Sequence, residues 1–287
     1  MNARRAALLM IASGALYAIL WACIRYASAQ VHPFVIVFFR NVFGLLALAP
    51  WLIRTGRAAV KTRRFTGHLA RGLASTIAMA GIYYSISAIP LAQVVALSYA
   101  APLFAALGAV VVLGEKLRAR RITAILIGFA GMLIVLRPGI ETFSLGVGAA
   151  LVGALGMAGV MLTVKNLADT ERPATIVVYA NSLTMPAALA LAIWFWRWPV
   201  GVDWIWLVLI GTLSTLAQIL MNRAFALADT SVILPYDFLR LLFATGLGVA
   251  LFGERIDMVS ILGAAIILGA TVYVARRDML ARARRRA

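Results

Sequence analysis

The chain has 287 residues, 63% of them hydrophobic, and a mean hydropathy of +0.96. Because a soluble domain is closer to half apolar, this composition excludes a soluble globular protein and indicates a lipid bilayer as the solvent. The net charge of +17 does not point to a nucleic-acid-binding protein, since the basic residues lie between and beyond the apolar segments.

Ten apolar segments with short connections follow one another along the chain. A helix needs about 20 apolar residues to cross the hydrocarbon core of a bilayer. The first segment looks like a secretory signal peptide ending at Ala27-Ser28-Ala29, but Arg25 and Tyr26 interrupt it, so we interpret it as a retained helix. The predicted transmembrane helices cover residues 6–25, 34–53, 69–88, 93–113, 120–137, 144–165, 174–195, 203–225, 231–252 and 258–275.

Two stretches of the chain repeat each other 139 residues apart. Leu103-Phe104 and Gly114-Glu115 recur as Leu242-Phe243 and Gly253-Glu254. Each half then holds five helices, and an odd number forces the second half to lie upside down relative to the first. We therefore predict an all-α integral membrane protein with ten transmembrane helices in two inverted five-helix repeats, residues 1–138 and 139–276, and a basic cytoplasmic tail, residues 277–287.

The distribution of Lys and Arg predicts the orientation in the membrane. With the N-terminus inside, 20 of the 27 basic residues, Arg71 among them, fall in inner segments and four at outer ends. The positive-inside rule then places both termini in the cytoplasm of a bacterial-type inner membrane. Five tryptophans flank an outer turn and are expected to form an interfacial aromatic belt: Trp194, Trp196, Trp198, Trp204 and Trp206.

Small residues predict which helix faces pack together. Gly146, Gly153, Gly156 and Gly159 make one side of helix 144–165 small, and Gly128 and Gly131 do the same for helix 120–137. In lipid, close approach of backbones drives the association of helices. We therefore expect these faces to meet other helices.

The three basic residues not counted at inner or outer ends, Arg40, Arg223 and Arg240, are assigned to predicted helices, and Asp237 is the one acid well inside a predicted span. Ionisable groups are costly there and become candidates for function. Arg40 lies about 10 Å deep, at 1.5 Å per residue, where it either binds a substrate carboxylate, snorkels to the outer interface, or makes a structural hydrogen bond. Asp237 and Arg240 are three residues apart and share a face, so they form either a structural pair or a polar lining of a cavity. Arg223 completes the set.

Neutral polar and aromatic residues gather at similar depths. Each alone is typical of helix packing, but together they predict an aromatic cavity with few fixed charges, suited to a small amphiphilic solute. With Arg40, Asp237 and Arg240, the predicted substrate-binding residues are Tyr17, Trp21, Tyr83, Tyr84, Ser98, Tyr99, Met157, Met161, Gln218, Asn222 and Tyr236.

The remaining motifs in the sequence indicate a structural role, and motifs typical of enzymes are absent. The Gly114-Glu115 and Gly253-Glu254 turns are interpreted as structural helix ends. His32 and His68 are expected to be solvated. The sequence contains no GxxxxGK[ST], HExxH or GxSxG motif, so we expect no enzyme, no catalytic residue, no metal and no cofactor.

The whole chain resembles the drug/metabolite transporter superfamily, EamA-type. The resemblance is carried by the ten helices, the Gly-Glu-(Lys/Arg) turn of each half, and the segments Pro102-Leu103-Phe104, Gly128, Gly131, Leu133 and Leu242-Phe243. It implies secondary transport, commonly the export of amino acids or other small metabolites, and the YddG-type amino-acid exporters are its leading candidate. Asp237 and Leu241 stand where the first half has Ser98 and Pro102, so binding roles do not transfer between the halves.

The predicted function is therefore the export of amino acids or related metabolites by alternating access. Carriers of riboflavin, nucleosides or drug-like compounds are alternatives within the same class. An intramembrane enzyme needs clustered carboxylates or histidines at one depth, and a channel needs a continuous polar stripe, neither of which the sequence contains. The expected partners are a small-molecule substrate and membrane lipid, without nucleic acid, while proton coupling and oligomeric state stay open.

Overall fold

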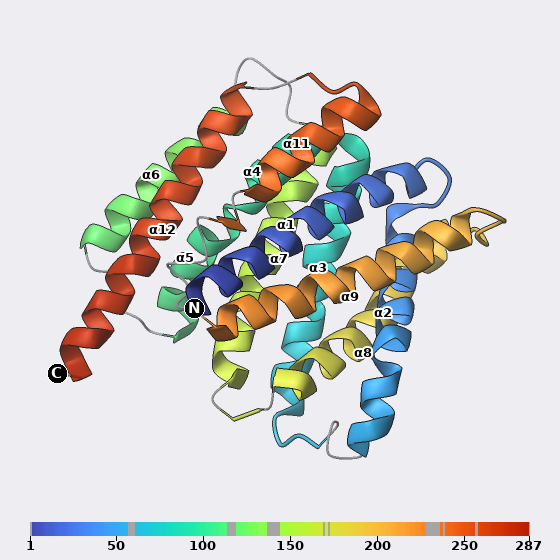
Figure 1. Ribbon diagram of the computed structural model, residues 1–287, viewed down its shortest axis with the longest axis horizontal. Coiled ribbons are helices and arrows are strands. Elements are labelled where there is room, and N and C mark those ends of the chain that lie inside the picture. Colours follow the sequence, from blue (N-terminus) through green and yellow to red (C-terminus); the bar gives the residue numbers. More distant parts are fainter. Residues whose placement is uncertain are drawn as a thin grey trace. The chain divides into compact units, whose positions relative to one another are not determined.

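The computed structural model describes residues 2–56, 61–113, 119–136, 144–168, 170–171, 173–227, 236–237, 239–255 and 258–286. Within these residues the chain is built of helices and contains no β-strand, which confirms the predicted all-α class (Figure 1). By length and composition, α1, α2, α7, α8 and α9 are long and apolar enough to cross a membrane. Shorter apolar helical stretches cover Leu91–Ala105, Leu126–Val135, Leu239–Phe252 and Met258–Ala270.

Most helices lie where the hydropathy places them. In chain order the structure has α1 (Asn2–Ala27), α2 (Pro33–Thr55), α3 (Phe65–Ala88), α4 (Leu91–Ser98), α5 (Ala101–Leu113), α6 (Ala119–Leu136), α7 (Leu145–Ala168), α8 (Pro173–Ala192), the short 3-10 helix η2 (Ile193–Phe195), α9 (Asp203–Leu227), α11 (Leu239–Phe252) and α12 (Met258–Arg286). At the C-terminus the structure differs from the prediction, because α12 continues beyond the predicted last helix, residues 258–275, into the basic tail.

The predicted helix 93–113 is two helices, α4 and α5, separated by a turn at Tyr99 and Ala100. Pro102 is the second residue of α5. Proline has no N–H to donate and a fixed φ, so it suits the first turn of a helix and not its interior. The proline therefore begins a new helix, and the interruption leaves Tyr99 at the end of α4.

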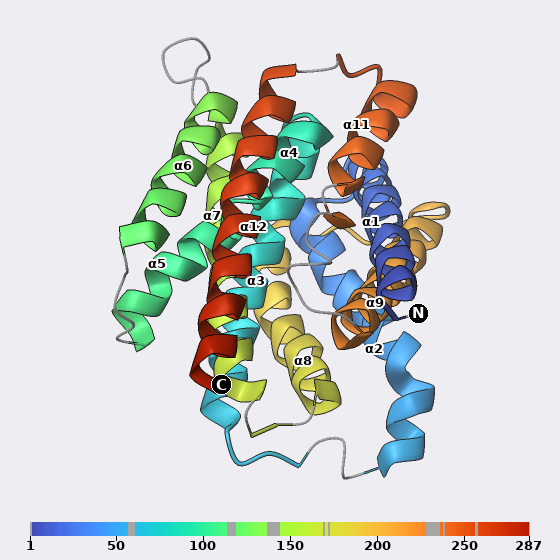
Figure 2. The same cartoon turned by 60° about the vertical axis from the view of Figure 1, so that its left-hand side comes forward.

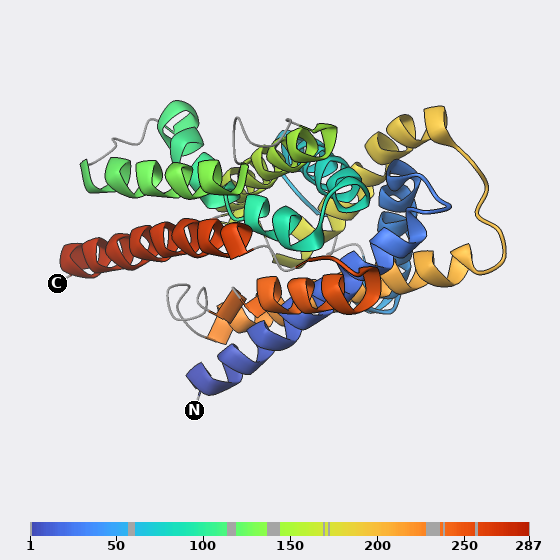
Figure 3. The same cartoon turned by 90° about the horizontal axis from the view of Figure 1, so that it is seen from above.

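The chain forms two compact units, and each takes segments from both halves of the sequence. Unit 1 comprises residues 1–19, 90–144 and 216–287, and unit 2 comprises residues 20–89 and 145–215. Within unit 1, α12 lies along α6, and α4 contacts both α11 and α12 (Figures 2 and 3). Within unit 2, α3 packs along α7 and α8, and α2 packs along α8.

Glycine allows the closest approach of helices in unit 2. A Cβ atom on Gly81 of α3 would lie 2.5 Å from the carbonyl oxygen of Ala149 and 2.6 Å from the amide nitrogen of Gly153, both on α7. A Cβ atom on Gly156 of α7 would lie 2.7 Å from the Cα atom of Ala78 on α3. The two backbones are therefore in direct contact, which confirms that this glycine face of the predicted helix 144–165 meets another helix.

The glycine face of α6 is also confirmed as a packing face, in unit 1. A Cβ atom on Gly131 would lie 2.8 Å from the carbonyl oxygen of Gly263 on α12, and Gly263 in turn meets the α6 backbone. Gly128 receives the side chain of Leu103 from α5. Small residues thus fix both the α3–α7 pair of unit 2 and the α6–α12 pair of unit 1.

Candidate substrate-binding site

The polar residues at membrane depth form two clusters, one in each unit, and the first lies at the start of α11 in unit 1. The Arg240 Nη2 atom lies 3.4 Å from Asp237 Oδ2, so the predicted pairing of these residues is confirmed. The Arg240 guanidinium carbon also lies 5.2 Å from the ring centroid of Tyr99 and 5.9 Å from that of Tyr17. One carboxylate and two aromatic faces therefore surround one cation.

Arg240 is 9% exposed, and its burial depends on this surrounding. An isolated guanidinium in an apolar interior is costly, and an ion pair together with the negative faces of aromatic rings offsets part of that cost. Gly14 of α1 packs beside it, since a Cβ atom there would be in ordinary contact with the Arg240 Cβ, at 3.5 Å. The Tyr99 hydroxyl donates a hydrogen bond of 2.9 Å to the carbonyl oxygen of Asp237.

The interruption between α4 and α5 thus positions Tyr99 for both of its contacts.

The two side chains of the ion pair differ in exposed fraction: Asp237 is 21% exposed and Arg240 is 11% exposed. The carboxylate is therefore the less covered group of the pair, and the guanidinium has the tyrosine rings beside it. Chemically, this cluster suits the binding of an amine beside an aromatic surface.

The second cluster surrounds Arg40 in unit 2. Its Nε atom donates to the Ser214 hydroxyl at 3.2 Å, and its Nη1 atom donates to Asn41 Oδ1 at 3.2 Å and contacts Met79 Sδ at 3.1 Å. Arg40 is 5% exposed, so the snorkelling alternative is wrong and the guanidinium stays among helices α2, α3 and α9. All three partners are neutral.

The remaining predicted residues divide between the units. In unit 1, Ser98 is buried and donates to the Val95 carbonyl of its own helix, Gln218 is half-buried on α9, and Tyr236 is exposed. The side chain of Asn222 lies outside the described residues. In unit 2, Trp21 and Tyr83 are buried, Tyr84 and Met157 are half-buried, and Met161 is exposed on α7.

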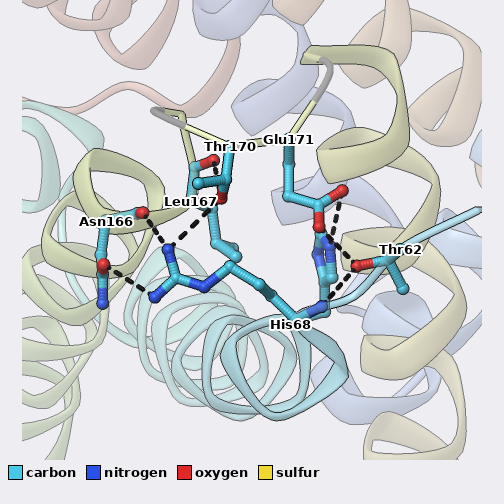
Figure 4. Close-up of polar contacts among 7 residues, drawn as sticks. Thr62, His68, Asn166, Leu167, Thr170 and Glu171 are labelled. Atoms are coloured by element: carbon cyan, nitrogen blue, oxygen red, sulfur yellow. Dashed lines mark hydrogen bonds and ion pairs between the residues drawn. The ribbon is translucent and has the colours of Figure 1, made fainter.

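A polar cluster at the α3–α7 end of unit 2 was not predicted (Figure 4). The Thr62 hydroxyl donates to Glu171 Oε1 at 2.6 Å, and the Arg64 guanidinium donates to both the carbonyl and the side-chain oxygen of Asn166. His68 Nε2 lies 3.8 Å from Glu171 Oε2. The cluster ties the segment before α3 to the end of α7 and to the connection that follows it.

The expectation that both histidines are solvated is wrong for His68, which is fully buried. The reason is that α3 begins four residues before the predicted helix 69–88, so His68 falls in its first turn. There its ring stacks on Tyr179 of α8, with centroids 4.4 Å apart. The predicted helix began too late because hydropathy does not detect a polar first turn, and the residues that cover His68 come from distant segments.

Glu171 makes the stability of this cluster depend on pH. A hydrogen bond from the Thr62 hydroxyl, then one from the Arg63 backbone and the charge of the nearby His68 ring, hold the pKa of Glu171 below its usual range. A carboxylate with a lowered pKa stabilises the folded state above its unfolded pKa of about 4.3, and this contribution is lost as the pH falls through the folded value. Glu171→Gln should therefore lower the Tm of detergent-solubilised protein at pH 7, and the difference from wild type should shrink below about pH 4. A difference that grows on acidification would contradict this.

The Gly253-Glu254 turn confirms one predicted helix end and adds a contact that sequence did not predict. Gly253 has a φ of 64°, the left-handed conformation that commonly ends a helix. The Glu254 carboxylate then accepts hydrogen bonds from the backbone N–H of Leu91, at 3.1 and 3.3 Å, at the first turn of α4. The equivalent Gly114-Glu115 turn lies outside the described residues.

Glu254→Ala is expected to destabilise the protein by about 1 kcal/mol, because it removes an anion from the N-terminus of α4 and leaves an amide without its acceptor. Thermal unfolding in detergent measures the loss. Arg255→Ala changes an exposed neighbour and serves as the control. Equal effects of the two substitutions would show that the turn, and not the cap, carries the stability.

A cavity of about 410 Å³ opens between the α1–α2 connection and η2, wholly within unit 2. His32 stacks on Phe195 there, with ring centroids 3.9 Å apart and planes 5° apart. Trp194 and Trp198, from the predicted tryptophan belt, are 83% and 70% exposed beside it. Such exposed aromatics at the end of apolar helices are typical of a membrane–water interface.

Comparison with known proteins decides the family. The model of the EamA-like transporter family matches residues 4–137 and again residues 144–276. The chain is a member of the EamA-like transporter family. The predicted resemblance to the drug/metabolite transporter superfamily is thereby confirmed, and by family the protein is a multi-pass membrane transporter.

Relatives of this EamA-like transporter differ in the solute for which they are named. A riboflavin transporter of Brucella anthropi is 30% identical over 94% of this chain and 98% of its own length. An S-adenosylmethionine uptake transporter of Rickettsia bellii is 26% identical over 87% and 86%. A pseudopaline exporter of Pseudomonas aeruginosa is 25% identical over 94% and 95%.

A solved crystal structure has the same fold. It superposes with a TM-score of 0.57 and 21% identity, covering 93% of this chain and 98% of that chain. At this identity the likeness concerns the fold alone. Family membership therefore establishes transport, and the solute has to be argued from the residues of the EamA-like protein itself.

Proposed function

We propose that this EamA-like transporter is a secondary carrier that exports amino acids or related small metabolites across the bacterial inner membrane by alternating access. The observation that supports the proposal is the Asp237–Arg240 pair enclosed by Tyr17 and Tyr99 in unit 1. The partly exposed carboxylate provides a place for the solute's ammonium group. The tyrosine rings provide a surface for an apolar or aromatic side chain.

The names of the relatives support a solute that combines an aromatic part with polar groups. S-adenosylmethionine has an amino-acid group and a flat adenine ring, and riboflavin has a flat ring system with a polar chain. An amino acid or a metabolite derived from one shares the ammonium group that Asp237 would bind. In the predicted orientation both termini lie in the cytoplasm, and the carrier moves the solute outwards.

Riboflavin transport is the second candidate, because the Brucella anthropi relative is named for it and aligns over almost its whole length. Riboflavin has no ammonium group. Its transport would therefore depend on the tyrosine surfaces and would not require the Asp237 charge. The two candidates consequently predict different responses to neutralising that carboxylate.

Counterflow in proteoliposomes tests the proposal. Vesicles preloaded with unlabelled amino acids are offered labelled threonine, methionine and phenylalanine separately, and a parallel set tests riboflavin and S-adenosylmethionine. Uptake of an amino acid that Asp237→Asn abolishes and Asp203→Asn retains supports the proposal. Riboflavin uptake alone, insensitive to Asp237→Asn, would replace it by the second candidate, and no uptake by folded protein would overturn both.

A further inference from the structure

Arg71 of α3 occupies a position that the basic pattern of the sequence did not predict. Counted among the inner basic segments, it lies instead in the second turn of α3, and its Nε and Nη1 atoms are buried. Among the residues that the structure describes, these two atoms have no hydrogen-bond partner, and the side chain as a whole is half-buried. This contrasts with Arg240, which has a carboxylate and two aromatic rings.

A second guanidinium adds to the same unbalanced charge. Arg40 also belongs to unit 2, uses its Nε and Nη1 atoms on neutral partners, and has no described acceptor for Nη2. Both arginines meet the same helix, since Met79, which Arg40 contacts, is two turns along α3 from Arg71. Ser75, which is 5% exposed, lies one turn from Arg71 and one turn from Met79, the residue that Arg40 contacts.

Among the described residues of unit 2, no acid pairs with Arg40 or Arg71. Residues 20–89 contain no Asp or Glu, and residues 145–215 contain only Asp169, Glu171 and Asp203. The Glu171 carboxylate binds Thr62 and His68, and Asp203 accepts from the backbone N–H of Val200 in the turn before α9. Asp169 is in the same connection as Glu171. The helices around Arg40 and Arg71 are therefore positively charged without a counter-ion of their own.

Such an arrangement is unfavourable unless an anion completes it. Burying an unpaired charge costs several kcal/mol, and two like charges in a medium of low polarity add to that cost. Guanidinium groups bind carboxylates and phosphates through paired, charge-assisted hydrogen bonds. A small oxyanion would accept hydrogen bonds from the unsatisfied Nε and Nη1 donors of Arg71, with Arg40 as a second positive charge along α3.

We propose that Arg40 and Arg71 form an anion-binding site within unit 2 that accepts a carboxylate or phosphate group. Its residues belong to unit 2, whereas the Asp237 cluster, for which we propose ammonium binding, belongs to unit 1. Two sources supply the anion: a carboxylate solute, in which case the site rests on the proposed transport function, or the phosphate of a bound lipid, in which case it does not.

Thermal unfolding of the full-length protein in neutral detergent tests the site without any transport step. Phosphate and acetate, each compared with chloride at equal ionic strength, should raise the Tm of wild type. Arg71→Gln should lose this response, with apparent anion affinity at least about tenfold weaker. Arg54→Gln, which changes an exposed arginine of α2, should keep it. Without added anion, Arg71→Gln should be at least as stable as wild type, because it removes an unpaired buried charge.

Reconstitution distinguishes the two sources. Vesicles of phosphatidylcholine alone and vesicles containing phosphatidylglycerol are compared, and native mass spectrometry records retained lipid. Anionic lipid that stays bound to wild type and not to Arg71→Gln identifies a lipid phosphate, whereas protection by acetate alone identifies a carboxylate.

Arg71→Lys is a second variant, used in case Arg71→Gln fails to fold. It keeps the positive charge, and its Tm should respond to added anion more weakly than that of wild type. Equal anion responses in wild type, Arg71→Gln and Arg71→Lys would overturn the site. Failed amino-acid counterflow with intact anion binding would overturn only the proposed function.

Discussion

Asp237→Ala is expected to destabilise the protein by about 2–3 kcal/mol, because it leaves the Arg240 guanidinium buried with only two aromatic faces to offset its charge. Breaking a fully buried ion pair costs about 3–5 kcal/mol. The expected value is smaller here, since the Asp237 side chain is 21% exposed and Tyr17 and Tyr99 remain. Unfolding followed by fluorescence in detergent measures the change.

The double variant Asp237→Ala with Arg240→Met provides the internal control. Once the cation is gone, the loss of the carboxylate no longer leaves an unpaired charge, so the double variant should be more stable than Asp237→Ala alone. A double variant that shows the plain sum of both single losses would mean that the pair is not coupled, and that Asp237 acts only through its backbone carbonyl and Tyr99.

Gly81→Val is expected to cost about 3 kcal/mol or more, or to prevent the assembly of unit 2. The added Cβ would lie 2.5 Å from a carbonyl oxygen and 2.6 Å from an amide nitrogen of α7, and backbone atoms cannot move aside as a flexible side chain does. The whole α3–α7 interface would have to separate. Expression yield and Tm in detergent report the effect.

Gly269→Ala of α12 is the matched control, because nothing lies within 4 Å of a Cβ at that position. It should be neutral or stabilise the protein by up to about 1 kcal/mol through the higher helix propensity of alanine. Equal losses at Gly81 and Gly269 would contradict close backbone packing as the reason for the glycine at position 81.

The sequence predicted those features of the fold that depend on local pattern. Apolar length located the helices, the i, i+3 spacing identified the Asp237–Arg240 pair, and the glycine spacing of helix 144–165 identified a packing face. Each of these depends on residues within one helix. The interruption at Tyr99 was missed, although Pro102 signalled it, because hydropathy runs unbroken through that turn.

The candidate sites were less predictable, since they depend on residues brought together from distant segments. Nothing near Tyr99 in the chain indicates that its hydroxyl reaches the Asp237 carbonyl. Arg71 looked like one more cytoplasmic cation, because charge counting does not register whether a side chain is covered. His68 was misplaced for the same reason, since its burial comes from Tyr179 and Glu171, more than 100 residues away.

The pairing of helices across the chain has a consequence for biosynthesis. The contacts α3–α7, α2–α8 and α6–α12, and the Glu254 cap on α4, all join a helix made before residue 137 to an element made after residue 144. When the ribosome has completed α6, the glycine faces of α3 and α6 still lack the helices that cover them in the folded protein. These faces stay without their helix partners until α7 and α12 have been synthesised. Two fragments split between α6 and α7 should each be degraded alone and rescue one another when made in the same cell.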